Sequence, residues 1–334
     1  MRRRSLWFLI YAVAVLFCLP AAAYFASQMA DDSPGMVRQE VNMTETTQEA
    51  LSQAELEKEQ TKEEKTISVP EEQELEEYLV GVVAAEMPAS FEMEALKAQA
   101  VAARTYAVYQ MDTQGISLSQ VQEAGGQAYI SEDQRRERWQ EKFEQYEKKI
   151  RTAVESTAGE ILVYDQEPIL AAFHAISAGA TEDAENLWSG EDLPYLQSVP
   201  SPMDTTSTEY VYTVSLTEEE TAALLQQADP ELILAEGSLI DQMQVLSRSD
   251  AGYIEQMQIG NRTYTGAQVR TALGLRSADF TVEEKDGVFI FTTYGYGHGG
   301  GMSQYGANAL ALDGMTYQDI LAYYYTDIQF AQIK

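Results

Sequence analysis

The chain has 334 residues, 45% of them hydrophobic, which is enough for one large or two medium domains with a substantial core. It has 53 acidic and 22 basic residues, and hence a formal net charge of −31 at pH 7. Nucleic-acid binding needs a basic surface for the phosphates, so this composition excludes it as a function class. The single cysteine, Cys18, lies in an apolar N-terminal run, so the rest of the chain has no thiol for a disulfide or a cysteine zinc site.

Residues 1–30 predict a cytoplasmic stub and a membrane anchor. The segment begins MRRRS and continues with an uncharged run over 6–26, which is long enough to cross a bilayer, and the arginines favour a cytoplasmic N-terminus. A cleaved signal peptide is the alternative, because the alanines at 21–23 would suit a peptidase, but the long apolar run favours a retained anchor. We therefore expect a single-pass protein of the cell membrane whose larger, C-terminal part is extracytoplasmic.

Residues 31–77 have no aromatic side chain and carry fifteen acidic residues against four basic ones. Such a composition does not bury enough apolar surface to fold independently. We predict an acidic, extended stalk over 31–68 and a folded extracytoplasmic domain over 69–334. A smaller subdomain is expected near 205–290.

The segment 71–109 carries the strongest candidate for a catalytic residue. At about 100° per residue, one apolar helix stripe is formed by Leu75, Leu79, Val82 and Val83. Glu86 falls in the same stripe, and Pro88 ends the helix, so Glu86 lies in its last turn. Burial and the helix dipole should both raise the pKa of this carboxyl, as a general acid for glycosidic bond cleavage requires. A solvated residue at a helix end is the alternative interpretation.

A second helix, rich in alanine, is predicted over 92–109, where small side chains permit close packing. Arg104 shares its small-residue face with Leu96 and Ala100. Its guanidinium could bind an anionic group of a substrate, pair with Glu86, or form a structural salt bridge. Pairing with Glu86 would lower the pKa of that carboxyl, so these alternatives matter for the acid hypothesis.

The next segments predict a charged helix, two strands and a long loop. Residues 131–154 carry charges at i,i+4 spacing and predict one mostly exposed helix. Residues 159–176 predict two strands with a turn at 165–167, and 177–202 form a loop of a length that is often functional. Candidates for substrate contact in this loop are Ser177, Gly179, Thr181 and Glu182, with Trp188 and Tyr195 as surfaces for sugar stacking. A packed surface loop is the alternative.

Strands and helices then alternate without a strict βαβ order. A strand from Glu209 precedes a helix capped by Thr217, two strands turn at 260–261, a short helix ends at Gly274, and a hairpin turns at 286–287. The fold class that this order favours is α+β, with mixed helices and mostly antiparallel strands around a cleft.

The segment 295–306 contains six glycines, which permit close approach of a chain or ligand but also occur in plain turns. His298 lies among them and is expected to be exposed and to titrate. Gln304 and Tyr305 begin a helix whose apolar residues should pack on the core: Ala309, Leu312, Ile320 and Tyr324. A phosphate loop is excluded, because GHGGGMSQYG lacks the terminal Lys-Ser/Thr.

Three segments together resemble the stage II sporulation protein D family, and the resemblance spans about 74–331. They are EYLVGVVAAEMPASFEMEALKAQAVAARTYA, SAGATEDAENLWSGEDLPYLQSV and GHGGGMSQYGANALALDGMTYQDILAYYY. The resemblance implies a membrane-tethered lytic transglycosylase that cuts the MurNAc-GlcNAc linkage of peptidoglycan, preferring peptide-free strands, and leaves 1,6-anhydro-MurNAc ends. It further implies a role in septal wall remodelling and engulfment during sporulation, with a peptidoglycan amidase and a membrane scaffold protein as partners.

The resemblance also implies site residues. The family's catalytic glutamate corresponds to Glu86 and its arginine to Arg104. The full set of expected substrate-binding residues is Arg104, Ser177, Tyr195, His298, Gln304 and Tyr305. One acid suffices for this reaction, because the 6-hydroxyl of the muramic acid attacks the anomeric carbon, whereas hydrolases usually need two carboxylates.

No cofactor or metal is expected. Some members of the family bind zinc through His and Cys in the segment that corresponds to 127–146, where this chain has neither, and its histidines are His174 and His298. The alternative function is a noncatalytic wall-binding protein that resembles the amidase enhancers, which share the fold.

Overall fold

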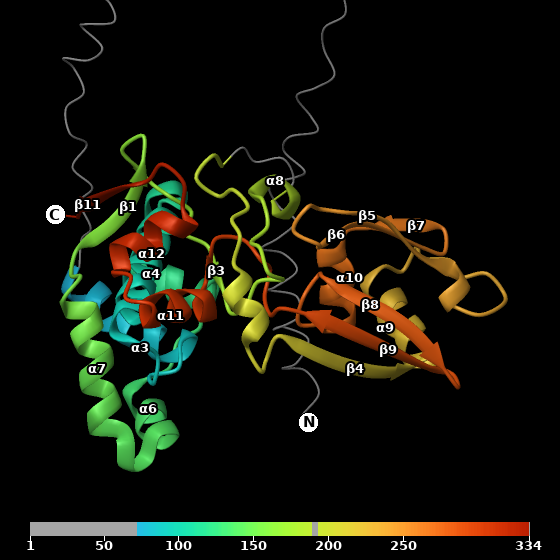
Figure 1. Cartoon of the computed structure of the whole chain (residues 1–334), viewed down its shortest axis with the longest axis horizontal. Helices are drawn as coiled ribbons and strands as arrows, with labels where there is room; N and C mark the ends of the chain where they lie inside the picture. Colours follow the sequence, from blue (N-terminus) through green and yellow to red (C-terminus); the bar gives the residue numbers. More distant parts are fainter. Residues whose placement is uncertain (1–71, 189–192, 334) are drawn as a thin grey trace, which may run out of the picture. The chain divides into compact units, whose positions relative to one another are not determined.

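The computed structural model describes residues 72–188 and 193–333 (Figure 1). The predicted anchor at 1–30 and stalk at 31–68 lie outside these residues, as does the start of the folded domain at 69. Over the part of the chain that is described, no helix is both long enough and apolar enough to span a bilayer.

Helices and strands are mixed along the chain. The helices are α3 (Glu72–Glu86), α4 (Met93–Gln114), α5 (Leu118–Ala124), α6 (Glu132–Trp139), α7 (Phe143–Glu155), α8 (Ala184–Leu187), α9 (Glu218–Ala228), α10 (Gly266–Leu273), α11 (Gln304–Leu312) and α12 (Tyr317–Tyr324), with 3-10 turns η1 (Gln140–Lys142), η2 (Pro202–Thr206) and η3 (Ile240–Gln242). The strands are β1 (Glu160–Tyr164), β2 (Glu167–Pro168), β3 (Phe173–His174), β4 (Val211–Thr217), β5 (Met243–Arg248), β6 (Ile254–Ile259), β7 (Arg262–Tyr264), β8 (Phe280–Lys285), β9 (Val288–Tyr294), β10 (Met302–Ser303) and β11 (Gln329–Gln332).

The first hydrophobic core surrounds α4. Its alanines are buried, and because they are small, α3, α7, α11, α12 and β1 all approach it closely (Figure 1). The predicted apolar stripe of α3 is fully buried against this core, and α3 ends at Glu86, two residues before Pro88. The sequence prediction of both helices is therefore confirmed. The end of α3 places Glu86 at the edge of the core.

The charged segment 131–154 forms two helices where one was predicted. The chain reverses at Gln140, which has a φ of +47°, so α6 folds back against α7. Arg135 of α6 then donates from Nε to Oε2 of Glu147 at 2.8 Å. In one straight helix these residues would be about 18 Å apart along the axis, so their ion pair requires the break.

The sheets are small and almost wholly antiparallel, which confirms the α+β class. They have the strand orders β11-β1-β2, β4-β9-β8 and β5-β6-β7, while β3 and β10 form a short parallel pair. The sheets that contain β4 to β9 enclose, with α9 and α10, a second hydrophobic cluster that includes Met257, Phe280 and Phe291. The predicted hairpin turn at 286–287 is present, with positive φ at both residues.

The C-terminal helical segment also differs from prediction. It forms α11 and α12, separated by Gly314, where a single helix was expected. Ile320 and Tyr324 are buried as predicted, but Leu312 is 66% exposed at the end of α11. Its predicted packing on the core is wrong, because the helix ends there and the chain turns.

Candidate functional site

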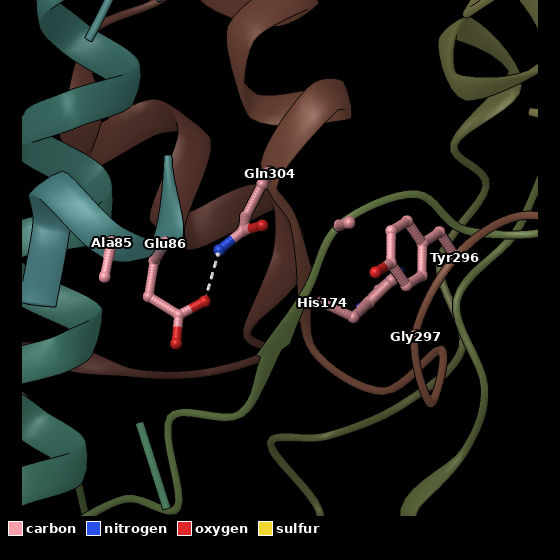
Figure 2. Close-up of a pocket in the computed structure, with 7 residues that line it drawn as sticks. Ala85, Glu86, His174, Tyr296, Gly297 and Gln304 are labelled. Atoms are coloured by element: carbon pink, nitrogen blue, oxygen red, sulfur yellow. Dashed lines mark hydrogen bonds between the residues drawn. The ribbon is translucent and has the colours of Figure 1, made fainter. Parts of the chain in front are cut away.

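Glu86 lies in a pocket of about 320 Å³ (Figure 2). The lining residues are Ala85, Glu86, His174, Ala175, Tyr296, Gly297 and Gln304. They come from the end of α3, from β3, from the glycine-rich turn after β9 and from the start of α11. The pocket therefore brings together the first and last of the segments that the sequence singled out.

The Glu86 carboxyl is half-buried and held by two hydrogen bonds. The backbone N–H of Ala128 donates to Oε1 at 2.7 Å, and Nε2 of Gln304 donates to Oε2 at 3.4 Å. Burial raises the pKa of Glu86, while these two hydrogen bonds act against the rise. The predicted direction is confirmed, with desolvation as its cause. A carboxyl in this state can both release and accept a proton near a bound ligand.

Gln304 is the first residue of α11 and connects Glu86 to the core. Its Nε2 also lies 3.3 Å from Oε1 of the buried Gln99 on α4. The helix start is fixed by Ser303, whose Oγ accepts from the N–H of Gly306 at 3.1 Å and donates to Asp204 at 2.8 Å. Gln304 is thus the one residue of the predicted substrate-binding set that lines the pocket.

The glycine-rich turn packs against β3 more closely than other residues would permit. A Cβ on Gly297, whose φ is +122°, would lie 2.7 Å from Cβ of His174. One on Gly301 would lie 1.9 Å from the carbonyl oxygen of Ala172. The close approach that the glycines were expected to permit is therefore made by another segment of the chain. This packing positions the pocket wall that carries Tyr296.

Both histidines lie beside this turn. Nδ1 of His174 bonds the carbonyl of Gly300 at 3.0 Å, and Nδ1 of His298 accepts from the N–H of Gly300 at 3.1 Å. Burial lowers the pKa of His174 to about 4 and that of His298 to about 3. The prediction that His298 is exposed and titrates is wrong, because the ring is desolvated against His174 and Trp188.

Arg104 is not in the pocket. Its guanidinium is fully buried and forms a two-pronged ion pair with Glu76, with Nε–Oε1 and Nη2–Oε2 both at 2.7 Å. Nη1 also donates to the carbonyl of Glu160 at 3.1 Å. Of the three interpretations that the sequence left open, this geometry is the structural salt bridge, so the predicted substrate contact is corrected.

Ser177, Tyr195 and Tyr305 also lie outside the pocket lining. Ser177 is buried, and its Oγ donates to Oδ2 of Asp204 at 2.6 Å. The Tyr195 hydroxyl accepts from the N–H of Leu170 at 3.1 Å, and its ring is only 7% exposed, so it offers no face for sugar stacking. Tyr305 is half-buried, with its ring edge-on to Phe91 at 5.0 Å. In this structure these three residues make packing and hydrogen-bond contacts within the protein and do not line the pocket.

Sequence reasoning missed three contributors to the site. His174 lines the pocket, and its Nε2 is buried without a hydrogen-bond partner among the described residues. Tyr296 lines the pocket and is 45% exposed. The one sequence signal for it was its position among the glycines of YGYGHGGG. Ala128 contributes a backbone N–H, for which no side-chain pattern exists. Over the described ranges, no three potential ligands among His, Cys, Asp and Glu are grouped to hold a metal ion.

Comparisons with known proteins agree with the resemblance. The family model described as SpoIID, stage II sporulation protein, matches residues 63–164, which include Glu86 and Arg104. The chain is 41% identical over 267 residues to stage II sporulation protein D of Bacillus subtilis, covering 77% of this chain and 74% of that one. The protein of the same name from Bacillus amyloliquefaciens is 39% identical over 265 residues, with the same coverage.

A third relative has a different name. The amidase enhancer of Bacillus subtilis is 29% identical over 295 residues, which cover 74% of this chain and 39% of the enhancer. Taken together, the matches define a bacterial sporulation protein with a relative among amidase enhancers. The chain belongs to the stage II sporulation protein D family.

Proposed function

We propose that the protein is a peptidoglycan lytic transglycosylase in which Glu86 is the single general acid and base. The observation that carries this proposal is the composition of the pocket. Glu86 is the one carboxylate among its described lining residues, and burial raises its pKa. Hydrolysis with retention or inversion usually needs a second carboxylate across the cleft, whereas an intramolecular attack does not.

The proposed reaction uses the same carboxyl twice. Glu86 donates its proton to the glycosidic oxygen between MurNAc and GlcNAc as the bond from that oxygen to C1 breaks. The 6-hydroxyl of the same MurNAc attacks C1, and its proton passes to the Glu86 carboxylate. The products are a free GlcNAc 4-hydroxyl and a 1,6-anhydro-MurNAc end, and the carboxyl is again protonated. Gln304 and the Ala128 N–H would hold the carboxyl in orientation through both steps.

The proposed setting follows from the family and the N-terminal sequence. We expect the predicted anchor to hold the protein in the septal or engulfing membrane of a sporulating cell, with the folded part outside. Its substrate would be peptidoglycan strands made peptide-free by an amidase, and that amidase and a membrane scaffold protein would be its partners.

The test compares the purified full-length chain with two variants on peptide-free glycan, with mass spectrometry for 1,6-anhydro ends. Glu86→Gln should lower the rate on the order of 10²- to 10⁴-fold, because a general acid is lost. Glu92→Gln is the matched control, since Glu92 is exposed at the start of α4, and it should keep the wild-type rate. Equal product profiles for wild type and Glu86→Gln would exclude the enzyme.

The second candidate function is a noncatalytic activator of an amidase, which the likeness to an amidase enhancer favours. In that case no 1,6-anhydro ends would form with any variant. Addition of the chain would instead accelerate peptide release by a partner amidase, and Glu86→Gln would do so equally well.

A further inference from the structure

The pocket wall that faces Glu86 belongs to a rigid turn that presents an aromatic ring. Figure 2 shows Glu86 on one side of the pocket and Tyr296 with Gly297 on the other. Tyr296 and Ile176 exchange two backbone hydrogen bonds of 2.7 and 3.0 Å. The flanking N–H groups of Gly295 and Gly297 donate to the carbonyls of Tyr210 and Arg276 at 2.8 and 2.9 Å. The Tyr296 ring is thus exposed on a backbone that is fixed at three points.

A row of stacked groups continues from Tyr296 away from the pocket. The Arg276 guanidinium lies 4.8 Å from the centre of the Tyr296 ring and 3.8 Å from that of Tyr212. Tyr212 is 42% exposed on β4, and Nη1 of Arg276 is held by Glu209 at 2.9 Å. Exposed rings with an apolar face and a polar edge suit contact with sugar rings.

A second arginine lies beside this row without an acidic partner. Nε of Arg270 donates at 3.1 Å to the same Arg276 carbonyl that accepts from Gly297. Among the described residues no carboxylate pairs with Arg270, and burial lowers its pKa. Burial lowers the pKa of the neighbouring His174 and His298, and an imidazole side chain supplies no negative charge.

Arg270 is half-buried, and a cation in such a place without a counterion is costly, so a ligand carboxylate would offset that cost. Guanidinium also matches carboxylate geometry through two parallel hydrogen bonds. The muramic acid side chain ends in such a carboxylate only where the peptide has been removed, because in the peptide-bearing strand it is an amide.

We propose that Tyr296, Arg276 and Tyr212 form a subsite for a sugar next to the cleaved linkage, and that Arg270 binds the free carboxylate of this glycan strand. The proposal rests on the proposed function, since it assumes that glycan enters the Glu86 pocket. It makes Arg270 the residue that distinguishes peptide-free strands from amidated ones.

The test uses two glycans of equal length, one with free carboxylates and one with the same groups capped as methylamides. With the full-length chain, kcat/KM should be on the order of 10-fold higher for the free carboxylate, as one charge-assisted pair predicts. Arg270→Gln should abolish the preference, mainly through a higher KM, while Arg270→Lys should keep part of it. Arg262→Gln is the matched control, because Arg262 on β7 pairs with Glu231 and Asp229. This variant should behave as wild type.

Equal kcat/KM of wild type for both glycans would overturn the subsite while leaving the cleavage function intact. The subsite would also be overturned if Arg270→Gln keeps the preference for the free-carboxylate glycan while its thermal stability is unchanged. If neither glycan is cleaved, the proposed function fails, and binding of fluorescent forms of the two glycans decides the subsite alone. A binding preference that is lost in Arg270→Gln would then support it in a noncatalytic protein, and equal binding would exclude it.

Discussion

At the Glu86 side chain, burial and hydrogen bonding oppose each other. Desolvation raises the pKa of the carboxyl, and the hydrogen bonds from Ala128 and Gln304 lower it. Because a general acid must be protonated, activity should fall as the pH rises through this pKa. The position of that decline on the pH axis therefore reports the balance between the two effects.

Replacement of Gln304 by leucine tests this balance. The variant removes a donor to the ionised carboxylate, so the Glu86 pKa should rise further, and the alkaline decline of kcat/KM should move to higher pH. The measurement is a pH-rate profile on peptide-free glycan. A decline that stays in place or moves to lower pH would mean that another group controls it.

Arg104 is expected to act on stability alone. Its ion pair with Glu76 is buried, so Arg104→Met should leave an unpaired carboxylate and lower the free energy of unfolding by about 3 to 5 kcal/mol. Arg136→Met is a matched control, because the Arg136–Glu132 pair is exposed to solvent and should change the free energy of unfolding far less than the buried Arg104–Glu76 pair. Urea unfolding measures both changes.

A further variant separates the structural role of Arg104 from substrate contact. The double variant Glu76→Leu, Arg104→Met should recover most of the lost stability, because no unpaired charge remains. Wild-type stability of Arg104→Met together with a raised KM would contradict the structural role.

The sequence predicted the partial burial of Glu86 at the end of α3 and the direction of its pKa shift for a physical reason. A carboxylate in the apolar stripe of a helix is a local anomaly, visible from residues within two turns. The partner of Arg104 could not be chosen in the same way, because Glu76 is 28 residues away and the pairing depends on how α3 crosses α4. For His298, exposure was inferred from its glycine neighbours, but the rings of His174 and Trp188, from distant segments, pack against it.

At the scale of elements, the glycine-rich turn is held against β3 by contacts that exclude side chains. Gly297→Ala combines a strained φ of +122° with a clash against Cβ of His174. Gly314→Ala shares only the strain, with a φ of +93° and no atom within 4 Å. Because the clash displaces the wall that carries Tyr296, Gly297→Ala should lower kcat/KM about 10-fold or more.

The matched Gly314→Ala variant should lower stability by about 1 to 3 kcal/mol and leave kcat/KM unchanged. Thermal unfolding and initial rates distinguish the two variants. Equal rates for both would mean that the turn can shift without consequence for the site.

Local chemistry predicted the elements whose ends it controls. Thr217 caps α9, Gly274 ends α10, and the turn at 286–287 joins β8 to β9, all as expected from residues within a few positions. The break between α6 and α7 brings Arg135 to Glu147, twelve residues along the chain, and the β3–β10 pairing joins residues 173 and 302. Neither leaves a local pattern, because each is decided by packing between segments.

At the scale of the whole described unit, polar contacts tie the loop that follows β3 to the part of the chain that encloses the second hydrophobic cluster. The Tyr253 hydroxyl accepts from the N–H of Ala178 at 2.9 Å, and Oγ of Ser249 donates to Glu182 at 2.5 Å. Tyr210 donates to the carbonyl of Ala178 at 3.0 Å. The same part of the chain also carries Tyr212 on β4, Arg270 on α10 and Arg276 just after α10.

The net charge of −31 predicts an unusual dependence on salt. A peptide-free glycan carries one carboxylate on each muramic acid, so enzyme and substrate repel each other at long range, while Arg270 attracts only at contact. The Debye length falls from about 30 Å at 0.01 M to about 8 Å at 0.15 M, so salt screens the repulsion more than the contact. Between these concentrations kcat/KM for the free-carboxylate glycan should rise several-fold, because the screened repulsion slows the encounter of enzyme and glycan less.

The methylamide-capped glycan is the control for this prediction, because it is uncharged and its kcat/KM should change little with salt. For both substrates kcat at saturation should stay constant, since the long-range field acts on encounter and not on the bound complex. A fall of kcat/KM with salt for the charged glycan would show that basic residues around the pocket dominate the encounter. The acidic surplus of the chain would then be too distant from the pocket to act on the approaching strand.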